Sequence, residues 1–324
     1  MITKVETLDN IEVYLKQGSL GIYFQRQEQL YYLNGIVPEL IQDKIFGFHV
    51  QDQWVYYAEK EETSNIYRVD VQRGITQKLE GEYYYNGIHK GKDFDYIFGE
   101  EEGEEYLYTF NKETFQIENK FTDQIVGLPK GELVPYQLII KTRTKPFLYD
   151  IIKNQSIWEF PLEIKTGGDV FLYRDILLVP LENFNLLGID AHSGKMLWQL
   201  EKCFPYHNLD QEKGLLYGFG GQHLQVIDIR QGKKIKEHLF QESKELGITT
   251  SSHMNALCGE YLWFTSWRYG QKFGKINLNT YQIEFVYEMK KGEAVQAALD
   301  RPKVYQGYIY IRDSEGYLHI YKEE

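Results

Sequence analysis

One hairpin-like pattern recurs along this chain at intervals close to forty residues. Residues 186–200 read LLGIDAHSGKMLWQL, in which two apolar stretches flank a polar segment that begins with Asp190 and ends with Gly194. An aspartate at the start of a turn accepts hydrogen bonds from the amides ahead of it, and glycine tolerates the positive φ at the end. The segment therefore predicts two antiparallel strands joined by a tight turn.

Copies of this pattern can be aligned at eight positions, seven of which are Asp or Asn. These anchor positions are Asn34, Asp70, Asn111, Asp150, Asp190, Asp228, Asn277 and Tyr321. Four residues after an anchor, Gly or Asn recurs at Gly74, Asn154, Gly194 and Gly232. A fixed period of this length, with short strands between turn signals, is typical of a radial β-repeat. The sequence therefore predicts a β-propeller.

Each repeat contains four strand-like segments, as in DVFLYRD, ILLVPLE, NLLGIDA and KMLWQLE of the fifth repeat. Four strands make one propeller blade. The eighth repeat has three such segments, and residues 2–8 (ITKVETL) remain to supply the fourth. This pairing would close the ring and remove two exposed sheet edges. We expect an all-β fold in which residues 1–324 form a single eight-bladed propeller, with seven blades as the alternative.

The spacing of Asp, Gly and Trp in IDAHSGKMLW resembles the repeat of the quinoprotein-dehydrogenase-like (PQQ-type) β-propellers. Such a resemblance implies the fold and not the chemistry. Quinone-dependent members hold their cofactor with a disulfide between adjacent cysteines, a tryptophan platform and a calcium site. The two cysteines here, Cys203 and Cys258, are 55 residues apart, so we expect no PQQ. Other members are outer-membrane assembly lipoproteins, which need an export signal and a lipid-bearing cysteine that MITKVETLDN does not provide.

The charge balance argues against several classes of partner. The net charge is −11, from 36 Lys plus Arg and 47 Asp plus Glu. Nucleic-acid binding depends on basic side chains that neutralise phosphates, so we expect no nucleic-acid partner. No apolar run approaches the roughly 20 residues that span a bilayer, and no apolar segment follows Met1 as in a signal peptide. We expect a monomeric cytoplasmic protein that does not bind membranes.

Titratable residues recur at a second position of the repeat. They stand 21 to 24 residues before the anchors, and they are His49, His89, Asp169, His207, His253 and Asp300. In propellers of this kind the first strand of each blade lines the central channel, so we expect these residues to ring one mouth of it. Imidazole and carboxylate groups are common ligands of divalent metals. Neighbouring blades could bring together His49 with His89 and His207 with His253, and we take His207 and His253 as the candidate metal ligands. The alternative is that these side chains only line a hydrated channel mouth.

A second candidate cluster is aromatic. The seventh repeat contains Trp267, Arg268 and Tyr269, and it follows the longest connection between repeats, QESKELGITTSS. Exposed Trp, Tyr and Arg are typical anchors of a binding surface. We expect this cluster to lie on the same face as the titratable ring.

These features favour a non-catalytic scaffold that binds a protein or another macromolecular partner through one face of the ring. The alternative is a metal-assisted enzyme, similar to the cytoplasmic propellers that cleave oligouronides by β-elimination with a histidine-ligated metal. A scaffold needs only a rigid ring with binding side chains on one face. A lyase needs several ligands to converge and a general base, which the sequence does not identify.

Overall fold

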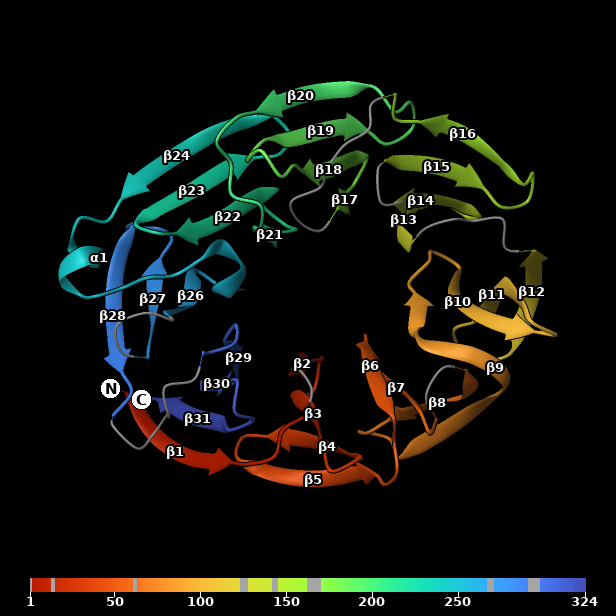
Figure 1. Ribbon diagram of the computed structural model, residues 1–324, viewed down its shortest axis with the longest axis horizontal. Helices are drawn as coiled ribbons and strands as arrows, with labels where there is room; N and C mark the ends of the chain where they lie inside the picture. Colours follow the sequence, from red (N-terminus) through yellow and green to blue (C-terminus); the bar gives the residue numbers. More distant parts are fainter. Residues whose placement is uncertain are drawn as a thin grey trace.

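The computed structural model describes residues 2–12, 15–60, 63–122, 128–141, 145–161, 170–266, 271–290 and 298–324. Within these ranges the regular structure is antiparallel β-sheet, apart from the short helices α1 (Glu242–Glu245) and η1 (Ser252–Met254). Figure 1 shows the sheets arranged around a common centre, with one edge strand of each facing inward and the other at the rim. No helix in the described part of the chain is long and apolar enough to cross a membrane.

Five four-stranded sheets are each built from consecutive strands. The first contains β2 (Lys16–Gln17), β3 (Ile22–Arg26), β4 (Gln29–Asn34) and β5 (Val37–Gln42). The second contains β13 (Leu128–Val134), β14 (Gln137–Lys141), β15 (Pro146–Asp150) and β16 (Gln155–Glu159). The third contains β17 (Phe171–Tyr173), β18 (Ile176–Pro180), β19 (Leu186–Asp190) and β20 (Met196–Leu200). The fourth contains β21 (Asn208–Asp210), β22 (Leu215–Gly220), β23 (His223–Asp228) and β24 (Lys233–Leu239). The fifth contains β25 (Asn255–Cys258), β26 (Tyr261–Ser266), β27 (Lys272–Asn277) and β28 (Gln282–Glu288).

A sixth four-stranded sheet joins the first strand of the chain to the last three. Its order is β1 (Ile2–Leu8), β31 (Leu318–Glu323), β30 (Tyr308–Arg312) and β29 (Lys303–Tyr305). The antiparallel pairing of β1 with β31 runs from Ile2 opposite Glu323 to Leu8 opposite Leu318, with a register shift between Lys4 and Glu6. Figure 1 shows these two strands side by side.

The second and third repeats differ from the pattern expected from the sequence, because they share one strand. The seven-stranded sheet contains β6 (Gly47–Gln51), β7 (Trp54–Ala58), β8 (Ser64–Asp70), β9 (Ile75–His89), β10 (Phe94–Glu101), β11 (Glu104–Asn111) and β12 (Ile117–Thr122). The first half of β9 pairs with β8 and its second half with β10, and Tyr83 is opposite residues of both. Strand β9 therefore serves as the last strand of one repeat and the first strand of the next.

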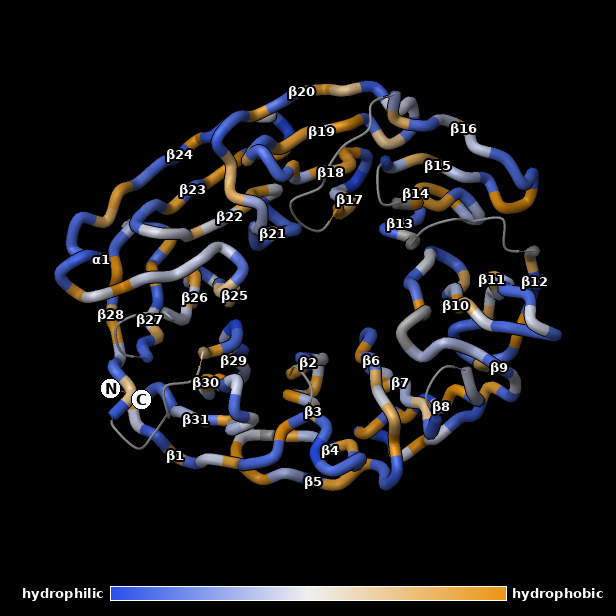
Figure 2. Tube along the Cα trace, in the orientation of Figure 1, coloured by the Kyte–Doolittle hydropathy of each residue, from blue (hydrophilic) through white to orange (hydrophobic). Residues whose placement is uncertain are grey.

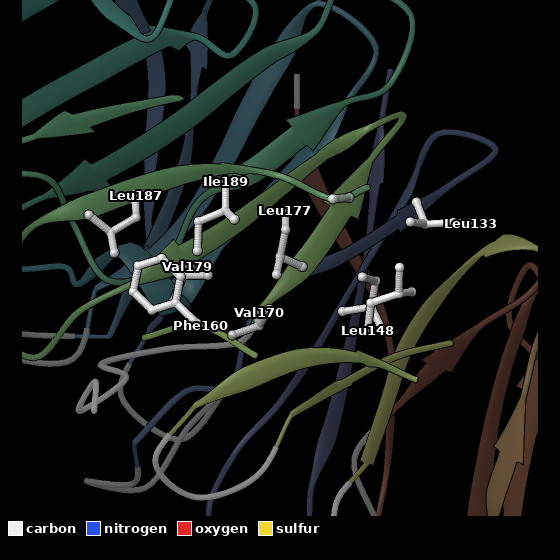
Figure 3. Packing of buried hydrophobic residues seen from close by; sticks show 10 residues of the cluster. Leu133, Leu148, Phe160, Val170, Leu177, Val179, Leu187 and Ile189 are labelled. Carbon is white, nitrogen blue, oxygen red and sulfur yellow. The ribbon is translucent and has the colours of Figure 1, made fainter. Parts of the chain in front are cut away.

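The hydrophobic core lies between neighbouring sheets. One cluster joins the β13–β16 sheet to the β17–β20 sheet through Leu133, Leu148, Val179 and Ile189, among others (Figure 3). Strands that are covered on both sides are expected to be continuously apolar, and four of the five residues of β18 are buried. Figure 2 shows the corresponding hydrophobic stretches on β18 and β19.

The Asp and Asn anchors mark the ends of strands. Seven of them are the last residues of β4, β8, β11, β15, β19, β23 and β27. Asp190 Oδ1 accepts a hydrogen bond from the Ser193 amide at 2.7 Å, and Asp228 Oδ1 accepts one from the Gln231 amide at 3.0 Å. The eighth position differs, because Tyr321 lies inside β31 and is completely buried.

Candidate functional site

Four segments that are far apart in the sequence line one cavity of about 730 Å³. They are β2 with the residue before it, β6, helix η1 and the segment that leads into β29, and the strands β2, β6 and β29 all lie on the inner side of the ring (Figure 1). The lining residues are Leu15, Lys16, Gln17, Val50, His253, Met254, Asp300, Arg301 and Lys303. Two of the residues predicted from the repeat, His253 and Asp300, therefore meet at this cavity.

Three cationic side chains dominate the lining. Lys16 and Lys303 are the first residues of their inner strands, and each is opposite a tyrosine of the next strand, Tyr23 and Tyr310. Both lysines are half-buried, whereas Arg301 is exposed to solvent. Within the described residues, none of the three cations forms an ion pair with a carboxylate.

The charges in the cavity act on one another. The pKa of Lys303 is lowered to about 8, mainly because burial disfavours the ammonium form and also because Arg301 and Lys16 repel it. Partial loss of hydration of its guanidinium also lowers the pKa of Arg301, but a guanidinium stays charged at neutral pH. The cavity is therefore positively charged at pH 7, although the chain as a whole carries a net charge of −11.

The carboxylate at the cavity is already paired. Asp300 Oδ2 accepts a hydrogen bond from Arg312 Nη1 at 3.1 Å, and the Asp300 carbonyl accepts one from Thr265 Oγ1 at 3.1 Å. Arg312 is fixed in turn, because its Nε donates to the carbonyl of Ile11 at 3.0 Å. Asp300 therefore does little to neutralise the three cations.

Arg301 is held in place by a residue from another sheet. Its Nη2 donates a hydrogen bond to Oδ1 of Asn208, the first residue of β21. Asn208 is 5% exposed, and its Oδ1 also accepts the Leu257 amide of β25 at 3.3 Å. This hydrogen-bond network connects three inner segments of the ring, so the guanidinium has a defined position.

The described residues that were predicted to form one titratable ring lie in or shortly before the inner strands. His49 is in the middle of β6, His89 is the last residue of β9, His207 directly precedes β21, and His253 is in η1. Asp300 stands three residues before β29. The strand registers place His49 and His89 at the same height, since each is opposite a tyrosine that stands two residues after the residue facing the anchor. Asn208 is at this height in its own sheet, so His207 lies one residue away from it. His253 lies outside its sheet, in η1.

Burial keeps three of the histidines neutral at pH 7. The pKa values of His89 and His207 are lowered to about 4 by burial, with a further contribution from His49 and Lys130 in the case of His89. The pKa of His49 is also lowered, first by burial and then by Lys16. The Nε2 atoms of His89 and His207 are buried without a hydrogen-bond partner in the described structure.

His253 has a different environment. It is exposed, its Nδ1 lies 2.7 Å from Ser251 Oγ, and its ring packs on Tyr206 with 5.7 Å between centroids. His207 packs instead on Phe204, with 6.4 Å between centroids. Among the described residues, no group of three or more His, Cys, Asp or Glu side chains is placed to hold a metal ion. A metal ion bound by His207 and His253 would therefore have no third His, Cys, Asp or Glu ligand among the described residues.

Four of the predicted site residues, Asp169, Trp267, Arg268 and Tyr269, lie outside the described residues. The connection QESKELGITTSS is described, and it contains α1. Its Thr249 amide donates to Ser266 Oγ at 2.8 Å, and this hydroxyl donates to the Thr249 carbonyl at 2.9 Å. These bonds hold the end of the connection against β26.

Sequence reasoning overlooked the lysines of the cavity, although a signal was present. Lys16 precedes the anchor Asn34 by 18 residues, and Lys303 precedes the anchor Tyr321 by the same number. Arg301 and Asn208 share another register, since each stands 20 residues before its own anchor.

The sequence matches no protein family in a scan of known families and no curated protein. Solved structures match over nearly the whole chain. The C-terminal WD40 domain of Sif2 has a TM-score of 0.66 at 9% identity and covers 100% of this chain and 99% of its own. BamB from Moraxella catarrhalis has a TM-score of 0.60 at 12% identity and covers 100% of both chains. Sqt1 from Saccharomyces cerevisiae has a TM-score of 0.57 at 11% identity, covering 99% of this chain and 98% of its own. These neighbours are β-propeller proteins, so the chain has a β-propeller fold, and identities this low show nothing beyond the fold.

Proposed function

We propose that this chain is a non-catalytic β-propeller scaffold that binds a protein or another macromolecular partner through the face of the ring at which the inner strands begin. The observation that carries the proposal is the convergence of β2, β6, η1 and the segment before β29 on one charged cavity. The neighbouring structures belong to a class of proteins that commonly act as protein-interaction scaffolds. A rigid ring that gathers side chains from distant repeats is suited to recognising a partner too large for a single loop.

Our proposal includes eight blades in a closed ring. Support for eight comes from the anchors, seven of which end the third strand of a repeat, and from β9, which contributes to two repeats. Support for closure comes from the pairing of β1 with β31, which supplies a fourth strand to the sheet of β29, β30 and β31. Closure would make the ring rigid without a disulfide, because every sheet would pack between two others.

The experiment that tests the scaffold function begins with affinity purification from the native host and identification of the partner by mass spectrometry. Binding of the purified partner is then measured for wild-type protein and for two double variants, Trp267→Ala with Arg268→Ala and Lys16→Met with Lys303→Met. Replacement of central interface anchors typically weakens binding by about 2 kcal/mol or more, and we expect that loss for at least one of these variants.

Variants of the opposite face provide the control. Consecutive strands run antiparallel, so the turn after the third strand of a sheet lies at the opposite end from the start of its inner strand. Lys195 and Lys233 occupy two such turn regions and are exposed. We expect Lys195→Met with Lys233→Met to bind the partner as wild type does. Loss of binding in this control, with full binding in the other two variants, would place the function on the opposite face.

A further inference from the structure

We propose that the cavity lined by Lys16, Arg301 and Lys303 binds a small polyvalent anion that carries phosphate or carboxylate groups. This inference goes beyond the scaffold function, because it concerns a small ligand and holds whether or not a macromolecule binds the same face. The argument rests on the charge of the cavity, on the anchoring of its arginine and on its size.

The charge of the cavity has no counterpart in the described part of the chain. Lys16 comes from β2, Lys303 from β29 and Arg301 from the segment just before β29, so residues from the two ends of the chain meet only in the folded protein. Asp300 is already bound to Arg312. Like charges that are partly removed from water destabilise one another unless a counter-charge is present. An anion from solution would provide that counter-charge.

The position of Arg301 is suited to binding such an anion. One of its nitrogens, Nη2, bonds to the buried Asn208, which holds the guanidinium at the cavity wall. A guanidinium has five N–H donors, so donors remain for a phosphate or carboxylate, which it can bind through two parallel hydrogen bonds. Fixing the donor group before the ligand arrives lowers the entropic cost of binding.

The size and the walls of the cavity favour an organic anion over an inorganic ion alone. Small-molecule sites usually measure roughly 300–1,000 Å³, and this cavity measures about 730 Å³. Leu15, Val50 and Met254 contribute apolar surface, while Gln17 and His253 add polar groups. The three cations can therefore hold the charged groups of a ligand whose carbon skeleton contacts the apolar wall.

The ionisation of Lys303 makes this binding dependent on pH. The charged groups that act on its ammonium are Arg301 and Lys16, which lower its pKa, and Asp300, which raises it. With a pKa of about 8, Lys303 is charged at pH 7 and largely neutral at pH 9. A bound anion stabilises the charged form, so binding near pH 8 takes up a proton. The affinity therefore falls as the pH rises through 8.

The test is isothermal titration calorimetry of the full chain with citrate and with pyrophosphate, at an ionic strength kept constant with sodium chloride. We expect binding of one ligand per chain, and at least tenfold weaker binding by Lys16→Met with Lys303→Met. The double variant Lys195→Met with Lys233→Met removes the same charge from exposed positions elsewhere, and we expect wild-type affinity from it. Citrate binding alone would assign the site to carboxylates, and pyrophosphate binding alone would assign it to phosphates.

A conservative variant separates a specific role of Lys303 from an effect on folding. Lys303→Arg keeps a charge that does not titrate below pH 10. This variant should bind the anion at pH 7, and its affinity should stay the same between pH 7 and pH 9. The proposal is overturned if wild-type protein binds neither probe at millimolar concentration. It is also overturned if the control variant Lys195→Met with Lys233→Met weakens binding as much as Lys16→Met with Lys303→Met does.

Discussion

The indole of Trp198, in β20, packs against Gly232 in the turn after β23 of the next sheet. A Cβ added to Gly232 would lie 2.2 Å from Cγ of Trp198, and the φ of this glycine is +58°. The same relationship joins Trp158 to Gly194, where a Cβ would lie 2.6 Å from Cδ2 of the indole. Trp158 Nε1 also donates to the Ala191 carbonyl at 2.9 Å. The Trp of one repeat therefore packs on the Gly of the next, and the repeated motif is a contact between sheets.

This contact predicts the effect of Gly232→Ala. The methyl group would collide with Trp198, and an alanine at positive φ adds backbone strain, so we expect the free energy of unfolding to fall by about 2–4 kcal/mol. Gly74→Ala is a matched control, because Gly74 occupies the same register with a φ of +65° and no atom lies within 4 Å of an added Cβ. The control should lose only about 1–2 kcal/mol, from backbone strain alone. Urea denaturation of both variants measures the difference, and equal losses would show that the indole contact contributes nothing.

Acid should destabilise the protein through His89 and His207. Their folded pKa values of about 4 lie below the ordinary value of 6.5, so between these pH values the unfolded chain binds one more proton at each histidine. Stability is therefore complete above pH 6.5 and decreases as the pH falls toward 4, by about 1.4 kcal/mol per pH unit for each histidine. For His207→Gln we expect the free energy of unfolding to depend less steeply on pH, by the contribution of one proton. Denaturant unfolding at several pH values measures this slope.

His89→Gln provides a second, independent measurement, because burial lowers the pKa of His89 to about 4 as it does for His207. The slope of its free energy of unfolding against pH should decrease by the same amount. If His207→Gln keeps the wild-type slope, His207 is not the buried neutral group that the structure describes.

The bond between Arg301 and Asn208 should contribute to stability as a coupled pair. Asn208→Ala removes the acceptor of both Arg301 and the Leu257 amide, and we expect a loss of about 1–3 kcal/mol because a buried donor is left unpaired. Arg301→Met removes one donor and also relieves the repulsion on Lys303, so it should cost less. A double-mutant cycle based on denaturant unfolding gives the coupling energy. A coupling energy of zero would mean that this hydrogen bond does not form in solution.

Removal of residues 1–8 tests ring closure. The deletion exposes the hydrogen-bonding edge of β31 and the apolar surface covered by Val5 and Leu8, so we expect unfolding to become easier by about 3 kcal/mol or more. An unpaired strand edge also promotes self-association, which size-exclusion chromatography detects. The double variant Thr3→Ala with Glu6→Ala keeps the backbone pairing and changes only exposed side chains, so it should behave as wild type. Unchanged thermal unfolding of the deletion variant would contradict closure through β1.

The sequence by itself determined the features that depend on local physics. Asp190 and Asp228 bond to amides three residues ahead, so their turns form from the chain segment alone and mark the ends of β19 and β23 wherever the repeat occurs. The period between anchors then predicts the radial β-fold. The sequence did not predict that β9 is one continuous strand. Nothing in residues 75–89 indicates that its first half pairs with β8 and its second half with β10.

Only the tertiary structure decided which residues meet. His253 and Asp300 come from different repeats and line one cavity with Lys16, whereas His89 and His207 are not among the residues that line it. Lys16 and Lys303 stand at opposite ends of the chain and line the same cavity, since the sheet that contains β2 packs against the sheet that contains β29. The cavity depends on this long-range contact, and no periodicity within a single repeat encodes it.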